Sequence, residues 1–159
     1  ITYMRPFKIG DWIEVKDITG CVLEKTALVT RLRTIHNEDI TVPNSTILAN
    51  HTTNFSSSSN TTGLLINTTV TIGYDIDWHR VHELLLQSAL NVADIDTTRP
   101  PFVFQKELND YYVSYEINVY TRHPERMYHI KSDLHQYIQD YFKAAGIEIV
   151  SPQQIHIKP

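Results

Sequence analysis

The chain has 159 residues, of which 42% are hydrophobic and 20% are charged, and its formal net charge is −4. This composition is typical of a folded protein with one ordinary domain or two small ones. No apolar run approaches the ~20 residues of a transmembrane helix, and no signal-peptide pattern opens the chain. The single cysteine, Cys21, cannot form an internal disulfide, which suits a reducing compartment.

Short β-prone segments dominate the first third of the chain. Residues 11–17, "DWIEVKD", alternate, with Ile13 and Val15 on the apolar side. A turn at Gly20 leads into the long β-prone run 21–35, whose apolar members are Val22, Leu23, Leu28, Val29, Leu32 and Ile35. The segment "HNED" (36–39) is typical of a hairpin turn, although it lacks the usual glycine.

The strand that follows this turn ends at a proline. Residues 40–42, "ITV", precede Pro43, which has no amide hydrogen for a sheet ladder. Asn44 or Ser45 is predicted to cap a single helical turn in "STILAN". Several short strands in fewer than 50 residues favour a small, strongly bent barrel.

The low-complexity segment "SSSSNTTG" (56–63) predicts a domain boundary. Five Asn-x-Ser/Thr triplets surround it, as expected by chance in a segment this rich in Asn and Thr, beginning at Asn44, Asn50, Asn54, Asn60 and Asn67. Without a secretory signal they have no route to glycosylation.

After this boundary, strand and helix periodicities alternate. Strands are predicted at 64–73, 102–108, 111–121 and 147–150, and helices at about 75–92 and 124–145. The first helix places Val81, Leu84, Leu85, Ser88, Ala89 and Val92 on one face, and the second Met127, Ile130, Leu134, Ile138, Tyr141 and Ala145. The order β-α-β-β-α-β predicts a ferredoxin-like sandwich with both helices on one sheet face.

Residues suited to catalysis or metal binding are sparse. His79 and His82 share a helix face and could both reach one Zn²⁺, but no motif supplies a third ligand, so a solvated helix face is the favoured interpretation. Cys21 lies in a strand that is predicted to be buried. Ser56–Ser59 lack the Gly-flanked turn of a nucleophilic serine, and no Gly-rich phosphate loop occurs. The residues predict neither an enzyme nor a cofactor.

Nucleic-acid binding is also disfavoured. Residues 1–33 carry six Lys/Arg and four Asp/Glu, a net charge of +2, whereas residues 34–159 carry eight and fourteen, a net charge of −6. A polyanion partner usually requires a clearly basic face. Phe7, Trp12 and Phe55 could stack on bases, but they lie among acidic residues as often as basic ones.

An ordered set of motifs carries a family resemblance across essentially the whole chain. The β-rich part contains Arg5-Pro6-Phe7, Gly10-Asp11, Gly20-Cys21-Val22, Thr30–Thr34 including Arg33, Ile40-Thr41-Val42-Pro43-Asn44 and Asn54-Phe55-Ser56. The second part contains "GYDID" from Gly73 and "AAGIEIVSPQQ", with Gly146 and Pro152. In this order and spacing, the chain closely resembles the small-conductance mechanosensitive channel (MscS) family.

The resemblance implies a domain plan. Residues 1–7 would end the pore helix, 8–56 would form an Sm-like β-domain, 57–63 a linker, and 64–159 a ferredoxin-like α/β-domain with a C-terminal strand in a closing barrel. Asn54 and Ser56 would belong to the last β-domain strand. Because the chain starts with Ile rather than Met, we expect it to be a soluble fragment that lacks the preceding transmembrane helices.

The resemblance also implies a role. The chain would form the cytoplasmic cage of a tension-gated, largely non-selective channel at the inner membrane, assembled as a homoheptamer through which solutes pass. Arg5 and Lys8 would lie at the membrane surface near lipid. Residues 57–159, with a net charge of −4, would make the cage mildly cation-attracting. The alternatives are an Sm-like nucleic-acid-binding module and a ferredoxin-like sensor of small ligands.

Overall fold

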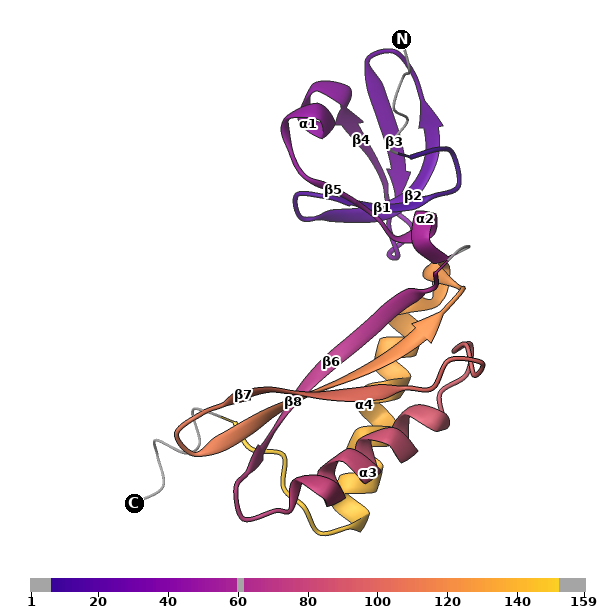
Figure 1. The fold of residues 1–159 in the computed structure, drawn as a ribbon. Helices are drawn as coiled ribbons and strands as arrows, with labels where there is room; N and C mark the ends of the chain where they lie inside the picture. The colour runs from indigo at the N-terminus through magenta and orange to yellow at the C-terminus, as the bar shows by residue number, and fades with distance from the viewer. Residues whose placement is uncertain (1–6, 60–61, 152–159) are drawn as a thin grey trace. The chain divides into compact units, whose positions relative to one another are not determined.

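A computed structural model of the chain describes residues 7–59 and 62–151. The chain divides into two compact units, residues 1–64 and residues 65–159. We call them the β unit and the α/β unit, and we describe each by itself. The first is built on a five-stranded sheet, and the second on a three-stranded sheet with two long helices (Figure 1).

The β unit is an antiparallel sheet with the strand order β4-β3-β2-β1-β5. Its elements are β1 (Trp12–Val15), β2 (Ile18–Lys25), β3 (Val29–Arg33), β4 (Asp39–Pro43), α1 (Asn44–Ala49), β5 (Thr52–Asn54) and α2 (Phe55–Ser59). The sequence predicts a small, strongly bent barrel, and within the described residues no ladder joins β4 to β5, so this sheet is not closed. The chain leaves β4 at a proline and enters α1, so β4 does not continue toward β5.

The predicted hairpin at "HNED" is confirmed, with asparagine in place of glycine. Asn37 has a φ of 61°, the left-handed conformation that asparagine tolerates better than most residues. The backbone amide of Thr34 donates to the carbonyl of Glu38 at 2.9 Å. The hydroxyl of Thr34 accepts hydrogen bonds from the backbone amides of His36 and Glu38. These contacts close the turn between β3 and β4.

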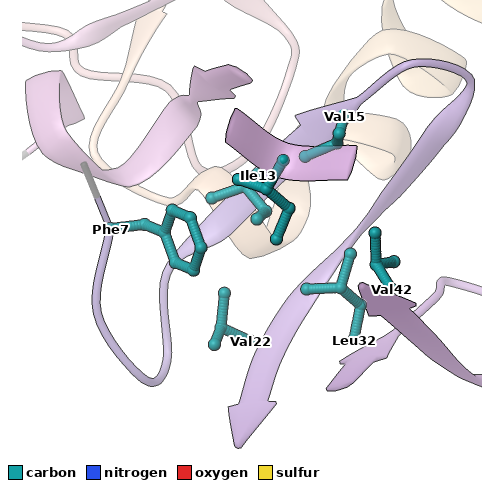
Figure 2. Packing of buried hydrophobic residues seen from close by; sticks show 7 residues of the cluster. Phe7, Ile13, Val15, Val22, Leu32 and Val42 are labelled. Carbon is teal, nitrogen blue, oxygen red and sulfur yellow. The ribbon is translucent and has the colours of Figure 1, made fainter. Parts of the chain in front are cut away.

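The core of the β unit consists of small aliphatic side chains and one aromatic ring (Figure 2). Its buried members are Phe7, Ile13, Val15, Val22, Leu32, Val42 and Ile47. The alternation predicted for β1 is confirmed, because Ile13 and Val15 are buried and Glu14 is exposed. Of the apolar residues of the predicted run 21–35, Val22 and Leu32 belong to the core, Leu23 and Val29 are partly buried, and Leu28 and Ile35 are exposed, at 79% and 47%. Leu28 lies in the turn between β2 and β3, and Ile35 lies in the turn after β3.

The α/β unit follows the predicted order of elements up to its last helix. It comprises β6 (Leu64–Gly73), α3 (Trp78–Leu90), β7 (Phe102–Leu108), β8 (Tyr112–Thr121), the 3₁₀ turn η1 (Pro124–Arg126) and α4 (Met127–Ala144). The sheet order is β6-β8-β7. The two helices pack against each other along one face of this sheet (Figure 1). The expected two-layer arrangement is therefore confirmed.

The helix faces agree closely with the predicted stripes. All six predicted residues of the first stripe are buried, from Val81 to Val92. In α4, Ile130, Leu134 and Ile138 are buried as predicted, but the fourth core position is Phe142 rather than Tyr141. Tyr141 lies at the edge of the stripe, where its hydroxyl accepts a hydrogen bond from the Asn91 side chain at 2.8 Å.

The strand predicted at residues 147–150 does not form. Val150 joins this segment to β6: its amide donates to the carbonyl of Thr71 at 2.9 Å, and its carbonyl accepts from the Thr71 hydroxyl. The segment thus runs beside β6, the outer position that a fourth ferredoxin-like strand would take, without a ladder of its own. The C-terminal barrel strand expected beyond it lies outside the described residues.

Candidate functional site

Four motif residues of the β unit, far apart in sequence, meet in one hydrogen-bonded network. Asp11 is 8% exposed, and its Oδ2 atom accepts from the backbone amide of Lys8 and the side-chain amide of Asn54, both at 3.0 Å. Gly10, with a φ of 94°, makes the sharp bend that brings Lys8 back to Asp11. The network thereby joins the segment before β1 to the end of β5.

Asn54 and Ser56 extend this network into α2. The Oδ1 atom of Asn54 accepts from the backbone amides of Ser56 and Ser57, at 2.9 and 3.1 Å, and so caps the helix. The hydroxyl of Ser56 accepts from the backbone amide of Trp12 at 2.9 Å. The sequence predicts Ser56 in the last strand of the β unit, but it lies in α2. The first residues of the expected linker 57–63 are also helical.

A second network is centred on the Pro43-Asn44 motif. Asn44 does not cap α1, contrary to the sequence prediction: the cap position is Pro43, and no side chain closes it. Instead Asn44 accepts from the Thr30 hydroxyl at 2.7 Å and donates to the carbonyl of Thr26 at 2.8 Å. Its backbone amide donates to the carbonyl of Leu28 at 2.9 Å. Asn44 therefore fastens the start of α1 to the turn between β2 and β3.

Gly20 and Arg33 face each other across β2 and β3. A side-chain carbon at Gly20 would lie 2.8 Å from the carbonyl oxygen of Arg33, so only glycine allows the two strands to approach this closely. The Arg33 guanidinium pairs with Asp39 at 2.9 Å, and Arg31 pairs with both Glu24 and Asp39. Asp39 remains ionised, because its hydrogen bond with Arg33 lowers its pKa below the ordinary value. These arginines are occupied by carboxylates, which leaves less positive charge available to phosphate groups.

The remaining motif residue near the start of the chain is Phe7, which is 5% exposed and belongs to the core. The ammonium group of Lys25 lies 4.2 Å from the centre of its ring and donates to its carbonyl at 3.1 Å. Phe7 is therefore not free to stack on a nucleobase. Arg5 and Pro6, expected near lipid or the pore helix, lie outside the described residues.

Cys21 is half-buried rather than fully buried, a correction to the sequence prediction. Its thiol lies 3.5 Å from the carbonyl of Gly10. Burial, and then the charge of Asp11, raise the pKa of Cys21 above its ordinary value. The thiolate is thus disfavoured, and the group is a poor nucleophile.

His79 and His82 do not converge on a common ligand. Asp77 Oδ1 accepts from the His79 amide and lies 2.8 Å from its Nδ1 atom, while the His82 ring packs edge-on against Trp78 and Tyr115. In the part of the chain that the structure describes, no three His, Cys, Asp or Glu side chains gather as a metal site. Burial, and then the charge of His79, lower the pKa of His82.

The motif glycines of the α/β unit end or turn secondary structure. Gly73 ends β6, and a side-chain carbon there would lie 2.6 Å from a carboxylate oxygen of Asp75. Gly146 has a φ of 71° and follows α4, where its amide donates to Lys143 and the amide of Ile147 donates to Phe142. This pair of bonds is a Schellman cap, as the predicted helix stop requires. Pro152 lies outside the described residues.

One feature was not found from the sequence. A pocket of about 250 Å³ lies between the loop after β6 and the tip of the β7–β8 hairpin, lined in part by Tyr74, Asp77, Trp78 and Tyr115. The cluster of aromatic and acidic residues in "GYDIDW" was a signal for it, but the contribution of Tyr115 required the fold.

The geometry of the motif residues is that of a scaffold. Glycines permit close approach and tight turns, and Asp11, Asn44 and Asn54 hold loops to strands. None of these groups is placed beside a nucleophile and a base. The arrangement therefore fixes the shape of the β unit.

Both units match models of one protein family. Residues 1–57 match the model described as "Mechanosensitive ion channel, beta-domain", and residues 66–149 match "Mechanosensitive ion channel MscS, C-terminal". The second match alone covers more than half of the chain. The chain belongs to the MscS family of mechanosensitive ion channels.

Curated MscS relatives match nearly the whole chain. The miniconductance mechanosensitive channel MscM of Escherichia coli K12 is 26% identical over 152 residues, which is 96% of this chain and 14% of that protein. The small-conductance mechanosensitive channel of Helicobacter pylori is 27% identical over 146 residues, covering 92% of this chain and 52% of that protein. The chain thus spans about half or less of the length of these two relatives.

Solved structures agree with this assignment. The closed-state crystal structure of Helicobacter pylori MscS superposes with a TM-score of 0.72 at 25% identity, over 92% of this chain and 56% of that one. The cryo-EM structure of AtMSL1 gives a TM-score of 0.61 at 16% identity, over 92% of this chain and 52% of that one, and supports the fold alone. Among the described residues, none of the helices has the length and apolar character required to span a membrane.

Proposed function

We propose that the chain is the cytoplasmic portion of a tension-gated, largely non-selective channel that releases ions and small osmolytes under hypo-osmotic stress. In this proposal the chain itself does no catalysis. Two observations support it most. The chain matches both family domains, one after the other, and it aligns over 92–96% of its length with proteins named as mechanosensitive channels.

The proposal includes a homo-oligomer, a heptamer in the full-length protein, at the cytoplasmic face of the inner membrane. The open sheet of the β unit is consistent with assembly, because β4 has one edge without a strand partner among the described residues. Unpaired strand edges are commonly covered by neighbouring chains. Arg5 and Lys8 would face lipid, and residues 1–7, 8–56, 57–63 and 64–159 would serve as pore-helix end, β-domain, linker and α/β-domain.

A mild preference for cations is part of the proposal. Residues 57–159 carry eight Lys/Arg and twelve Asp/Glu, a net charge of −4. A net negative wall concentrates cations near a solute path. A reversal potential in a KCl gradient that showed clear anion preference would contradict this part while leaving the channel role intact.

The proposal can be tested by replacing the matched part of the Helicobacter pylori channel with this chain. The chimera is expressed in bacteria that lack their own mechanosensitive channels, and survival after a sudden drop in osmolarity is measured. We expect survival close to that given by the intact Helicobacter pylori channel. Survival no better than with an empty vector, despite normal membrane insertion, would count against the proposal.

A matched pair of variants tests whether rescue by the chimera depends on the folded β unit. Asp11→Ala disrupts the network between β1 and β5, whereas Asp17→Ala removes an exposed carboxylate of the same unit. Only the first is expected to reduce rescue. Native mass spectrometry of the detergent-solubilised chimera then reports whether seven copies assemble.

A further inference from the structure

The pocket between the β6–α3 loop and the β7–β8 hairpin has a defined construction within the α/β unit. Its lining includes Tyr74, Asp77, Trp78, Leu108 and Tyr115. The Tyr74 hydroxyl donates to the carbonyl of Asn109 at 2.5 Å and so fastens the loop after β6 to the hairpin tip. The pocket walls are therefore held by a contact between segments that lie 35 residues apart.

Aromatic rings form much of the lining. Trp78 is 46% exposed and stacks on the His79 ring at a centroid distance of 3.6 Å, which fixes the orientation of the indole. Tyr74 is 52% exposed, whereas Tyr115 is 1% exposed and packs against His82. Exposed, oriented aromatic faces attract cations through the negative charge above the ring.

The charge of the lining also favours a cation. Asp77 is the only charged residue among the described residues that line the pocket. Its hydrogen bonds with His79 hold the pKa of its carboxyl below the ordinary value, so it is ionised at neutral pH. Burial, and then the charge of Asp77, raise the pKa of Tyr115 above its ordinary value.

From this geometry we propose that the pocket binds a small organic cation of the quaternary-ammonium class. The exposed rings of Tyr74 and Trp78 would contact the methyl groups above the buried Tyr115, and Asp77 would balance the charge. The volume of about 250 Å³ is below the roughly 300–1,000 Å³ of sites for drug-sized ligands, and so suits a molecule of few heavy atoms. This inference does not depend on the channel role.

The test uses the 159-residue chain labelled with ¹⁵N, because its two tryptophans give separate indole signals. Trp78 lines the pocket, and Trp12 in β1 of the other unit is an internal control. Tetramethylammonium chloride is titrated into the labelled chain, and a parallel titration with sodium chloride at the same ionic strength is the control. We expect a saturable shift of the Trp78 signal and no saturable shift of the Trp12 signal. No shift at Trp78, or equal shifts at both, would overturn the proposal.

A neutral isostere separates charge recognition from simple apolar binding. Choline and 3,3-dimethylbutan-1-ol have nearly the same shape, but only choline is charged. We expect choline to bind at least about tenfold more tightly, as cation–π and carboxylate contacts require. Equal affinities would identify an apolar pocket and overturn the proposal, as would a Trp78 shift that follows protein concentration alone, which indicates a contact between two copies.

Variants locate the contacts. Asp77→Asn keeps an oxygen that can cap α3 but removes the charge, and it is expected to weaken binding about tenfold. Asp140→Asn removes an exposed carboxylate on α4 and should leave binding unchanged. Tyr74→Phe keeps the ring but removes the hydroxyl bond to Asn109, so it should weaken binding less than Tyr74→Leu, which removes the ring as well. Unchanged affinity in both Asp77→Asn and Tyr74→Leu would overturn the proposal.

Discussion

In the β unit, a small aliphatic core is supplemented by polar side chains that bond to backbone, whereas the α/β unit depends on regular apolar stripes. Asp11 and Asn54 join β1, β5 and α2 through hydrogen bonds in the first unit. In the second, Leu85 and Leu134 lie on the two helices that pack together and are fully buried. The comparison teaches that polar motif residues shape the smaller unit, while hydrophobic periodicity shapes the larger one.

The largest expected effect comes from the helix stripe of the α/β unit. Leu85→Ala removes a fully buried side chain and is expected to lower the free energy of unfolding by about 2 to 5 kcal/mol. Leu90→Ala in the same helix changes a side chain that is 63% exposed and should cost less than about 0.5 kcal/mol. Urea denaturation followed by circular dichroism measures both. Similar losses for the two would refute the stripe as the source of stability.

The polar network of the β unit gives the next effect. Asp11→Ala removes the acceptor of two hydrogen bonds and is expected to cost about 1 to 3 kcal/mol. Asp17→Ala, at an exposed turn position, should cost less than about 0.5 kcal/mol. Hydrogen exchange at the Lys8 and Trp12 amides provides a local readout. If exchange there is unchanged in Asp11→Ala, the network does not hold β1 to β5.

Two glycines of the β unit separate steric crowding from backbone strain. Gly20→Ala places a carbon 2.8 Å from the Arg33 carbonyl oxygen and is expected to cost about 1 to 3 kcal/mol. Gly10→Ala meets no atom within 4 Å, but its φ of 94° is strained for alanine, so a cost of about 1 to 2 kcal/mol is expected. Thermal unfolding reports both. A crystal structure of Gly20→Ala should show β2 and β3 moved apart, and an unmoved pair would contradict the steric explanation.

The smallest effects depend on pH and differ between the units. The pKa of Asp39 is lowered by Arg33, so the unfolded chain binds the proton more readily and stability falls as the pH drops below the ordinary value of 3.8. The pKa of His82 is lowered by burial, so its contribution is present above 6.5 and is lost as the pH falls below that value.

Stability profiles of two variants check these windows. Relative to the unmodified chain, His82→Gln should flatten the profile between about pH 7.5 and pH 5, and Asp39→Asn should flatten it only in more acidic solution. If both variants changed the profile in the same pH range, the assignment of these groups would be wrong.

The regular parts of both units were predictable from the sequence. Alternation identified Ile13 and Val15 as core, and the 3.6-residue period identified the α3 stripe from Val81 to Val92. These predictions hold because burial of one face is a local pattern. The Gly146 helix stop was predicted for the same reason, since its signal lies within one turn.

What the sequence did not predict depends on partners that are distant along the chain. The sequence predicts that Asn44 caps α1, but its side chain bonds instead to Thr26 and Thr30, which lie 18 and 14 residues earlier in the chain. Ser56 was placed in a strand, although Asn54 caps a short helix there. The predicted strand 147–150 has suitable residues, but it begins with the Schellman cap of α4 at Ile147 and meets β6 at Val150 without forming a ladder. Residue types alone do not specify which of several possible partners is chosen.

The most direct test of the proposed channel role is patch-clamp recording from the chimera in which this chain replaces the matched part of the Helicobacter pylori channel. Suction is applied to membrane patches from cells that lack other mechanosensitive channels. The proposal predicts discrete currents that open with suction and close on its release, as with the intact relative recorded in parallel. Patches that contain the chimera at the membrane but stay silent until they rupture would contradict it.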